Sequence, residues 1–169
     1  MPKLAAEERV LALDVRRSTF GFAVFEGPDR LLDWGVHSFR GGANAVKVPP
    51  RKKLANLLDE YIPATLLVRG CPANAADARR ALSIAAKRGA AKRGIRVRTV
   101  SREEINRTFA DHRNKATIAT ALSIRFPELA RMLPPKRKIW KSEDYRMKIF
   151  DAAATAIAHF TGKTKPRSA

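Results

Sequence analysis

Short apolar runs alternate with polar turns in the N-terminal part of the chain. Residues 9–14 and 20–25 are apolar runs of strand length that are joined by a polar stretch. Residues 31–39 follow a Gly-Pro-Asp turn and place apolar side chains at alternate positions. Three consecutive strands joined by short turns predict an antiparallel meander.

The periodicity then changes to one in which helices and strands alternate. The pattern predicts a helix with one apolar face, a strand buried on both faces, an Ala-rich basic helix that ends at Gly94, and a strand of alternating character. These four elements are residues 46–61, 64–68, 75–93 and 95–100. Strands that alternate with helices in this way predict a parallel arrangement.

The C-terminal part is predicted to be helical. Ser101 caps a short helix to about residue 109, residues 115–126 form a second, and Ser142 caps a last helix with Glu143 and Asp144 in its first turn. The element order predicts an α/β fold with a five-stranded mixed sheet, three antiparallel strands followed by two parallel ones, flanked by helices. We expect one domain over residues 1–162 and a disordered basic tail over residues 163–169.

The charge of the chain points to a polyanionic partner. The 169 residues include 34 Lys and Arg against 16 Asp and Glu, which gives a formal net charge of +18. A solvated basic face explains single lysines but explains this excess poorly, so we expect nucleic acid. The basic residues are spread along the chain and no apolar run is long enough to span a membrane, so no membrane partner is predicted.

Cysteine use and the N-terminal residues suggest a cytoplasmic protein. The single cysteine, Cys71, excludes an internal disulfide. Acidic residues stand where a signal peptide would become apolar. We therefore expect a cytoplasmic location, with nucleoid association if the source is bacterial.

Three segments resemble RuvC-type Holliday junction resolvases and their YqgF-like relatives. Leu13-Asp14-Val15 followed by Gly21-Phe22-Ala23-Val24 resembles the opening of that family, where the first strand ends on a metal-binding Asp. Residues 101–117 resemble the segment after the fifth strand, with Lys115 at the lysine that opens the next helix. Residues 150–160 resemble the final helix, and Asp151 and His159 have the spacing of its last catalytic Asp and the following His.

The resemblance implies an RNase H-like fold and a metal-dependent nuclease. It implies Mg²⁺ (or Mn²⁺) as cofactor, branched DNA of the Holliday junction type as substrate, DNA in preference to RNA, and a homodimer, whose two-fold symmetry suits a four-way junction. The catalytic residues that it implies are Asp14, Asp151, Glu103, Glu104 and Lys115, of which Asp14, Asp151 and Glu104 are the expected metal ligands.

Two positions depart from the family's pattern. Arg69 stands where the family has a glutamate at the end of the fourth strand, and Lys148 stands where it has an acidic residue or histidine three positions before the last Asp. Glu103 or Glu104 is the substitute expected for the missing ligand.

Basic residues at connections and on exposed helices are predicted to contact nucleic acid. They are Arg16, Arg17, Arg69, Arg79, Arg80, Arg113, Lys136, Arg137, Lys138, Lys141 and Lys148. Trp140, between Lys138 and Lys141, either stacks on a base or packs in the core.

Three other residues have a structural interpretation as well. Asp14 can be a solvated strand end, and Asp144 can form a surface ion pair with Lys148. His159 can interact favourably with the helix dipole near a helix end rather than act as a base.

Three functions remain open from the sequence. The first is a RuvC-like, Mg²⁺-dependent endodeoxyribonuclease that acts in DNA recombination and repair. The second is a DNA- or RNA-binding protein on the same fold that has lost full metal ligation, which Arg69 and Lys148 favour. The third is a YqgF-like RNA-processing factor.

Overall fold

The computed structural model describes residues 8–17, 19–38, 49–71, 74–75, 77–112 and 114–164. Five strands form one mixed sheet in the order β3-β2-β1-β4-β5. The first three strands are antiparallel neighbours, and the last two run parallel to β1. The strands are β1 (Arg9–Val15), β2 (Thr19–Glu26), β3 (Leu31–Ser38), β4 (Thr65–Arg69) and β5 (Arg96–Val100). The predicted fold class is therefore confirmed.

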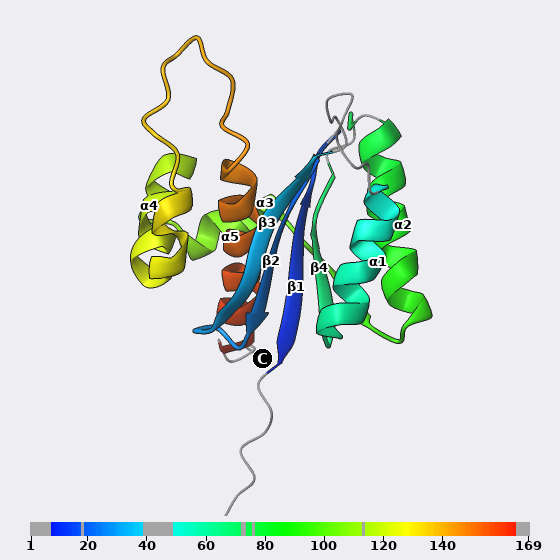
Figure 1. The fold of residues 1–169 in the computed structure, drawn as a ribbon. Coiled ribbons are helices and arrows are strands. Elements are labelled where there is room, and N and C mark those ends of the chain that lie inside the picture. The colour runs from blue at the N-terminus through cyan, green and yellow to red at the C-terminus, as the bar shows by residue number, and fades with distance from the viewer. Residues whose placement is uncertain are drawn as a thin grey trace, which may run out of the picture.

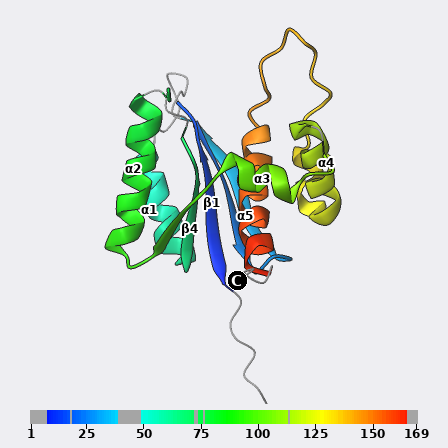
Figure 2. The same ribbon diagram turned by 180° about the vertical axis from the view of Figure 1, so that it is seen from behind.

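Helices cover both faces of the sheet. In Figures 1 and 2, α1 and α2 lie on one face, α5 lies against the other, and α3 and α4 lie beside α5. The helical elements are α1 (Pro50–Tyr61), α2 (Asp77–Lys92), α3 (Arg102–Thr108), α4 (Lys115–Arg125), the 3₁₀ helix η1 (Pro127–Met132) and α5 (Met147–Thr164). Among the helices of the described ranges, none is long and apolar enough to cross a membrane.

The alternation along β1 divides the core into two halves. Leu11, Leu13 and Val15 pack in the cluster that includes α1 and α2, while Val10 and Ala12 pack in the cluster that includes α5. Because successive side chains of a strand point to opposite faces, Asp14 shares the α5 face with Val10 and Ala12. Arg69 has the same parity as Leu67 on β4, which also packs in the α5 cluster.

The last helix begins later than predicted. α5 starts at Met147, and Ser142 does not cap it. Asp144 accepts hydrogen bonds from the backbone N–H of Arg146 at 2.9 Å and from the Arg146 guanidinium. These contacts hold a turn that precedes the helix. Glu143 pairs with Lys115 on α4 instead of lying in a first helical turn. A local ion pair of Asp144 and a tertiary ion pair of Glu143 thus replace the helix cap that the sequence suggested.

The other end of α5 extends to Thr164. The helix therefore continues past residue 162, and residues 165–169 of the predicted tail lie outside the described residues, as do residues 46–48 of the predicted first helix.

Candidate functional site

Asp14 is a buried carboxylate at the end of β1. Its side chain is fully buried, and Oδ2 accepts a hydrogen bond from Nε of Arg16 at 3.0 Å. Oδ1 is also buried and has no hydrogen-bond partner among the described residues. Because its side chain is buried, Asp14 is not the solvated strand end that Asp often provides. A buried carboxylate with one unsatisfied oxygen costs free energy of folding.

Gly21 allows α5 to bring Asp151 to Asp14. Gly21 lies directly opposite Asp14 on β2. A Cβ added at Gly21 would lie 2.4 Å from the backbone oxygen of Lys148, in the first turn of α5. Asp151 is three residues further along the helix, about 4.5 Å along its axis. The missing side chain of Gly21 thus sets the depth at which α5 rests on the sheet.

Arg16 joins the two carboxylates. Its Nη2 donates to Oδ2 of Asp151 at 3.2 Å, while its Nε donates to Asp14. Burial lowers the pKa of the Arg16 guanidinium, but Asp14, Asp151 and Glu143 outweigh burial and the net effect is a raised pKa. Arg16 therefore stays charged between the two carboxylates.

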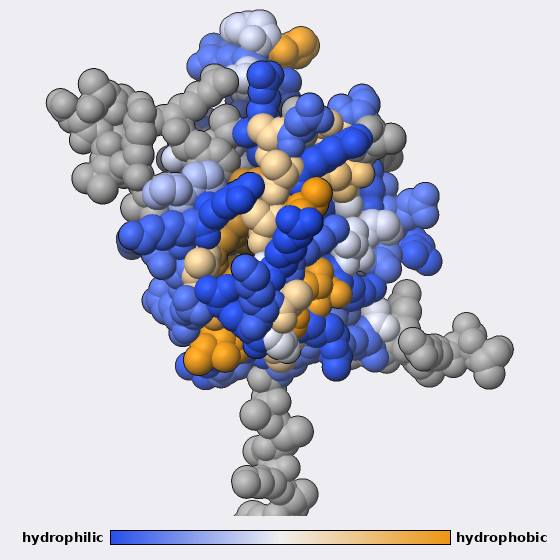
Figure 3. Space-filling view, turned by 90° about the vertical axis from the view of Figure 1, so that its right-hand side faces the viewer, coloured by the Kyte–Doolittle hydropathy of each residue, from blue (hydrophilic) through white to orange (hydrophobic). Residues whose placement is uncertain are grey.

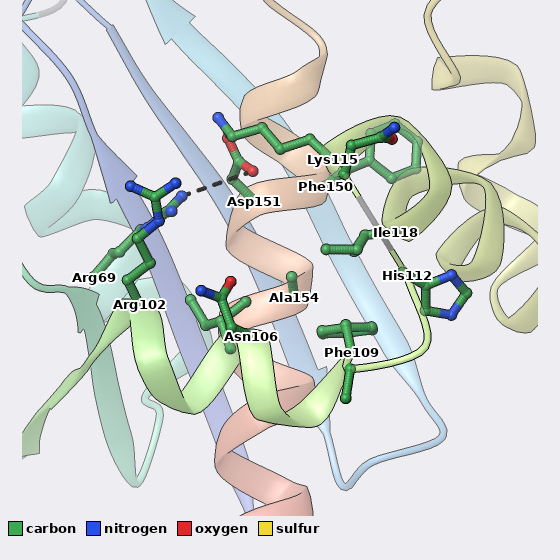
Figure 4. Close-up of a pocket in the computed structure, with 13 residues that line it drawn as sticks. Arg69, Arg102, Asn106, Phe109, His112, Lys115, Ile118, Phe150, Asp151 and Ala154 are labelled. Atoms are coloured by element: carbon green, nitrogen blue, oxygen red, sulfur yellow. Dashed lines mark hydrogen bonds and ion pairs between the residues drawn. The ribbon is translucent and has the colours of Figure 1, made fainter.

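Two further cations contact Asp151. Lys115, the first residue of α4, places Nζ 3.2 Å from Oδ2 of Asp151 and 3.3 Å from both carboxylate oxygens of Glu143. Nη1 of Arg69, at the end of β4, lies 3.8 Å from Oδ1 of Asp151 (Figure 4). Burial, and then the neighbouring Asp14, raise the pKa of Asp151, while Lys115 and Arg69 act in the opposite direction.

We define the paired cluster as Asp14, Asp151, Glu143, Arg16, Arg69 and Lys115. Its three carboxylates face three cations at 3.0 to 3.8 Å. The charges balance, so no net negative charge is left to attract a divalent cation. Mg²⁺ prefers several carboxylate and water oxygens in a near-octahedral shell, and a shell at Asp151 would have to displace the bound guanidinium and ammonium groups. A pair of metal ions therefore does not fit the side chains as they lie.

The predicted third metal ligand does not lie with Asp14 and Asp151. Oε1 of Glu104 accepts from Nη2 of Arg98 at 2.9 Å, and Arg98 also contacts His159. His159 is eight residues beyond Asp151 on α5, about 12 Å along the axis, so Glu104 belongs to a separate cluster. Glu103 is exposed on α3. Among the described residues, no group of three His, Cys, Asp or Glu side chains is placed to hold a metal ion.

The fold has clear relatives among solved structures. No protein-family model matches the chain, and no curated protein matches its sequence. RuvC of Thermus thermophilus in complex with a Holliday junction substrate superposes with a TM-score of 0.64 at 15% identity, over 93% of this chain and 96% of that one. A second structure of Thermus thermophilus RuvC gives a TM-score of 0.62 at 17% identity, over 92% and 95%. This chain has the RuvC fold.

Two further resolvases, one from yeast mitochondria and one from a virus, have the same fold. The yeast mitochondrial Holliday junction resolvase gives a TM-score of 0.55 at 13% identity, over 94% of this chain and 82% of that one. Fowlpox virus resolvase with substrate Holliday junction DNA gives 0.58 at 9% identity, over 89% and 99%.

The two departures from the RuvC pattern have different structural outcomes. Arg69 points into the paired cluster and contacts Asp151, so a cation stands at the strand end where the sequence resemblance expects a carboxylate. Lys148 contributes its backbone to the contact with Gly21, and its charge lowers the pKa of Asp144. Asp144 forms its ion pair with Arg146 at 2.8 Å, and this pairing, followed by burial acting in the opposite direction, brings its pKa to about 2.

The remaining predicted nucleic-acid contacts lie at several places. Arg17 is exposed beside Arg16, and Arg79 and Arg80 lie in the first turn of α2, which begins at the same edge of the sheet as the paired cluster because α2 follows β4. Arg113 lies outside the described residues. Four exposed cations belong to the loop between η1 and α5, namely Lys136, Arg137, Lys138 and Lys141.

Trp140 is exposed in that loop. Its side chain is 78% exposed, so it does not pack in the core, and Nζ of Lys138 lies 5.6 Å from its ring centroid. Figure 1 shows the loop projecting beyond the sheet next to the start of α5. The structure therefore leaves the indole ring available to a partner.

Some residues of the site carried no usable sequence signal. Glu143 looked like a helix-start residue, yet it binds Lys115. Arg102 and Asn106 of α3 line a pocket beside Asp151 with Phe109 and His112. Their spacing of four residues, with Ile105 buried between them, shows only that the two polar residues share one side of a short helix.

His159 lies in a second buried polar cluster. It is 3% exposed, and Nδ1 lies 2.9 Å from Nη1 of Arg98. Because a guanidinium only donates, Nδ1 accepts and the ring is neutral. Nε2 lies 3.5 Å from Oε2 of Glu8, which also pairs with Lys163. His159 is therefore a structural residue in the middle of α5, and neither a helix-end residue nor part of the paired cluster.

The pH dependence of stability follows from His159. Burial lowers its pKa below the usual 6.5, and Lys163 and Arg98 act in the same direction while Glu8 opposes them. Between the two pKa values the unfolded chain binds a proton at His159 and the folded chain does not. The contribution of neutral His159 to the free energy of unfolding is therefore fully present above pH 6.5 and is lost as the pH falls below it. We expect the thermal midpoint of the wild type to fall more between pH 7.5 and pH 5.5 than that of His159→Gln. Equal slopes in thermal melts would contradict this assignment.

Proposed function

We propose that the protein binds branched DNA of the four-way junction type through cations placed where a RuvC-like nuclease would hold metal ions. The observation that carries the proposal is the Arg16 guanidinium, which contacts both Asp14 and Asp151. With Arg69 and Lys115 also bound to Asp151, the carboxylates are occupied by the protein's own cations.

The surroundings of the paired cluster favour a phosphate ligand. The net charge of the chain is +18, and exposed basic residues lie beside the cluster at Arg17 and Arg102 and along the loop that contains Trp140. Lys and Arg side chains bind the DNA backbone by charge, and an exposed indole ring stacks on bases of an opened strand. The likeness to two resolvases solved with Holliday junctions supports a branched substrate.

A second copy of the chain would match the symmetry of a four-way junction. Ala81 and Ile84 are exposed on one side of α2, and Ile84 is 48% exposed. Figure 3 shows the side of the molecule on which α1 and α2 lie, where a narrow, less polar strip runs between charged residues. We propose α2 as the dimer contact, to be checked by measuring the mass of the protein in solution.

Metal-dependent cleavage is the second candidate function. It is favoured by Oδ1 of Asp14, which is buried and has no hydrogen-bond partner among the described residues. Arg16 would have to leave the two carboxylates before an ion could bind there. Its side chain is 31% exposed, which gives it a path towards solvent.

A labelled four-way junction and a linear duplex of equal length separate these functions. We expect tighter binding to the junction, no cleavage with Mg²⁺ or Mn²⁺, and affinity that falls with salt. Arg69→Ala should reduce the slope of log affinity against log salt by about 1, as expected for the loss of one phosphate contact.

Lys92→Ala is the matched control for the removal of one charge, because Lys92 lies at the other end of α2. Its salt slope should equal that of the wild type. Metal-dependent cleavage that disappears in Asp14→Asn would establish the second candidate instead. Absence of binding to either DNA would overturn both.

A further inference from the structure

A pocket of about 390 Å³ opens beside Asp151, between α3, the start of α4 and α5. Figure 4 shows Arg69, Arg102 and Lys115 gathered towards the Asp151 end, with Phe109 and Ile118 at the other end and Asn106 between them. Ile105, Phe150 and Ala154 complete an apolar floor, and all three are buried. The pocket is therefore cationic at one end and apolar at the other.

This division matches the two parts of a nucleotide. A phosphate group needs cations, and a base needs apolar or aromatic surface together with a few polar groups for its edge. The volume lies near the lower limit of small-ligand sites, roughly 300 Å³, which suits one base with its sugar. A stacked pair of bases or a duplex does not fit inside it.

Two polar side chains of the pocket have no partner within the part of the chain that the structure describes. No hydrogen bond or ion pair between described residues involves the Asn106 amide or the Arg102 guanidinium. An amide offers both a donor and an acceptor, which is what the edge of a base requires. Arg102 carries a free charge at the end nearest Asp151, where it can neutralise a backbone phosphate.

We propose that this pocket receives one unstacked base of the bound DNA, with Asn106 at the base edge and with Arg69 and Arg102 on the adjoining phosphate. The inference rests on the proposed function, because it takes the base from a strand held at the paired cluster. A base costs least to unstack where its pairing is already disturbed. A four-way junction therefore supplies a suitable base at its branch point more readily than an intact duplex does.

The test uses a four-way junction in which 2-aminopurine replaces single bases next to the branch point. Its fluorescence rises when the base leaves the stack, and we expect this rise on binding of the wild-type protein at one position. Ala154→Leu fills the floor of the pocket and should abolish the rise and weaken junction binding by about 5- to 150-fold, the effect of losing one stacked base. Asn106→Ala leaves the volume open and should weaken binding by about 2- to 10-fold, as for one hydrogen bond.

Asp111→Asn is the control, since Asp111 is exposed and is not part of the pocket lining. It should keep the wild-type affinity and fluorescence. Circular dichroism tests whether Ala154→Leu is folded. If it is not, the effect of Asn106→Ala on junction binding and fluorescence decides the test.

The failures of the two proposals are distinguishable. Junction binding without a fluorescence rise at any position, or with a rise unchanged in both pocket variants, would overturn the pocket and leave the proposed function standing. Binding of a free deoxynucleoside monophosphate without a rise in the junction would assign the pocket to a free nucleotide and overturn the strand as its source. Absence of junction binding would overturn the proposed function itself.

Discussion

Replacing Arg16 by alanine is expected to lower the thermal midpoint of unfolding by about 6 to 12 °C in metal-free buffer, and Mg²⁺ or Mn²⁺ should then raise it again. Arg16 is the only described side chain that contacts both Asp14 and Asp151. Removing one partner of a buried ion pair costs about 3 to 5 kcal/mol, and the lower end applies because Arg16 keeps 31% of its side chain exposed.

The metal response follows from the charge of the altered cluster. Without Arg16, the balance shifts to three carboxylates against two cations, and Asp14 loses its hydrogen-bond donor. Two adjacent buried carboxylates repel each other, and a divalent cation that binds only the folded state stabilises it. Adding Arg69→Glu removes a second cation and supplies a fourth carboxylate, so the double variant should respond to lower metal concentrations than Arg16→Ala does.

Thermal melts over a series of Mg²⁺ and Mn²⁺ concentrations provide the measurement. Arg30→Ala is the control, because it breaks an ion pair to Glu26 in which the arginine side chain is 69% exposed, and such pairs contribute about 0 to 1 kcal/mol. The wild type should show no metal response. A wild-type midpoint that rises with metal as much as that of Arg16→Ala would show that the cations leave the site readily and that our account of the paired cluster is wrong.

Gly21→Ala is expected to destabilise the fold and to separate Asp151 from Asp14. The new Cβ would lie 2.4 Å from the backbone oxygen of Lys148 and 2.6 Å from its carbonyl carbon, and backbone atoms cannot rotate away as a side chain can. The loss should reach the upper end of the roughly 1 to 3 kcal/mol typical of overpacking, because α5 must move as a unit. DNA binding should weaken with it.

Gly162→Ala, in α5, is the matched control. A Cβ there meets no atom within 4 Å, and alanine favours a helix over glycine by up to about 1 kcal/mol, so stability should be unchanged or slightly higher. Thermal melts and junction binding are compared for both variants. Wild-type stability in Gly21→Ala would mean that the first turn of α5 does not rest on Gly21 as closely as the structure shows.

Local pattern was sufficient to predict most of the fold. The short apolar runs joined by polar turns predicted an antiparallel meander, and the continuous apolar run in β4 predicted a buried strand parallel to it, and both are present. The start of α5 was wrong because Ser142, Glu143 and Asp144 form a good local cap, while Arg146 and Lys115 provide stronger partners for two of them. The capping rule fails here because Asp144 pairs with Arg146 in its own turn and Glu143 pairs with Lys115 of α4.

The candidate site was predictable only in part, and the reason lies in the range of the interactions. Asp14 and Asp151 could be selected from the sequence because the segments around them resemble the first strand and the last helix of RuvC-type resolvases. Glu104 was also selected for its position after β5, but its carboxylate is bound by Arg98, which alternation along β5 directs towards α5.

The sequence by itself determined the strand and helix order and the excess of positive charge, because these depend on periods of two and 3.6 residues and on composition. Only the tertiary structure decided that Asp14 and Asp151 would be neutralised by Arg16, Arg69 and Lys115. Arg16 and Asp151 are 135 residues apart, and their contact depends on how deeply α5 rests on Gly21. That depth is a property of packing between layers, which no periodicity along the chain encodes.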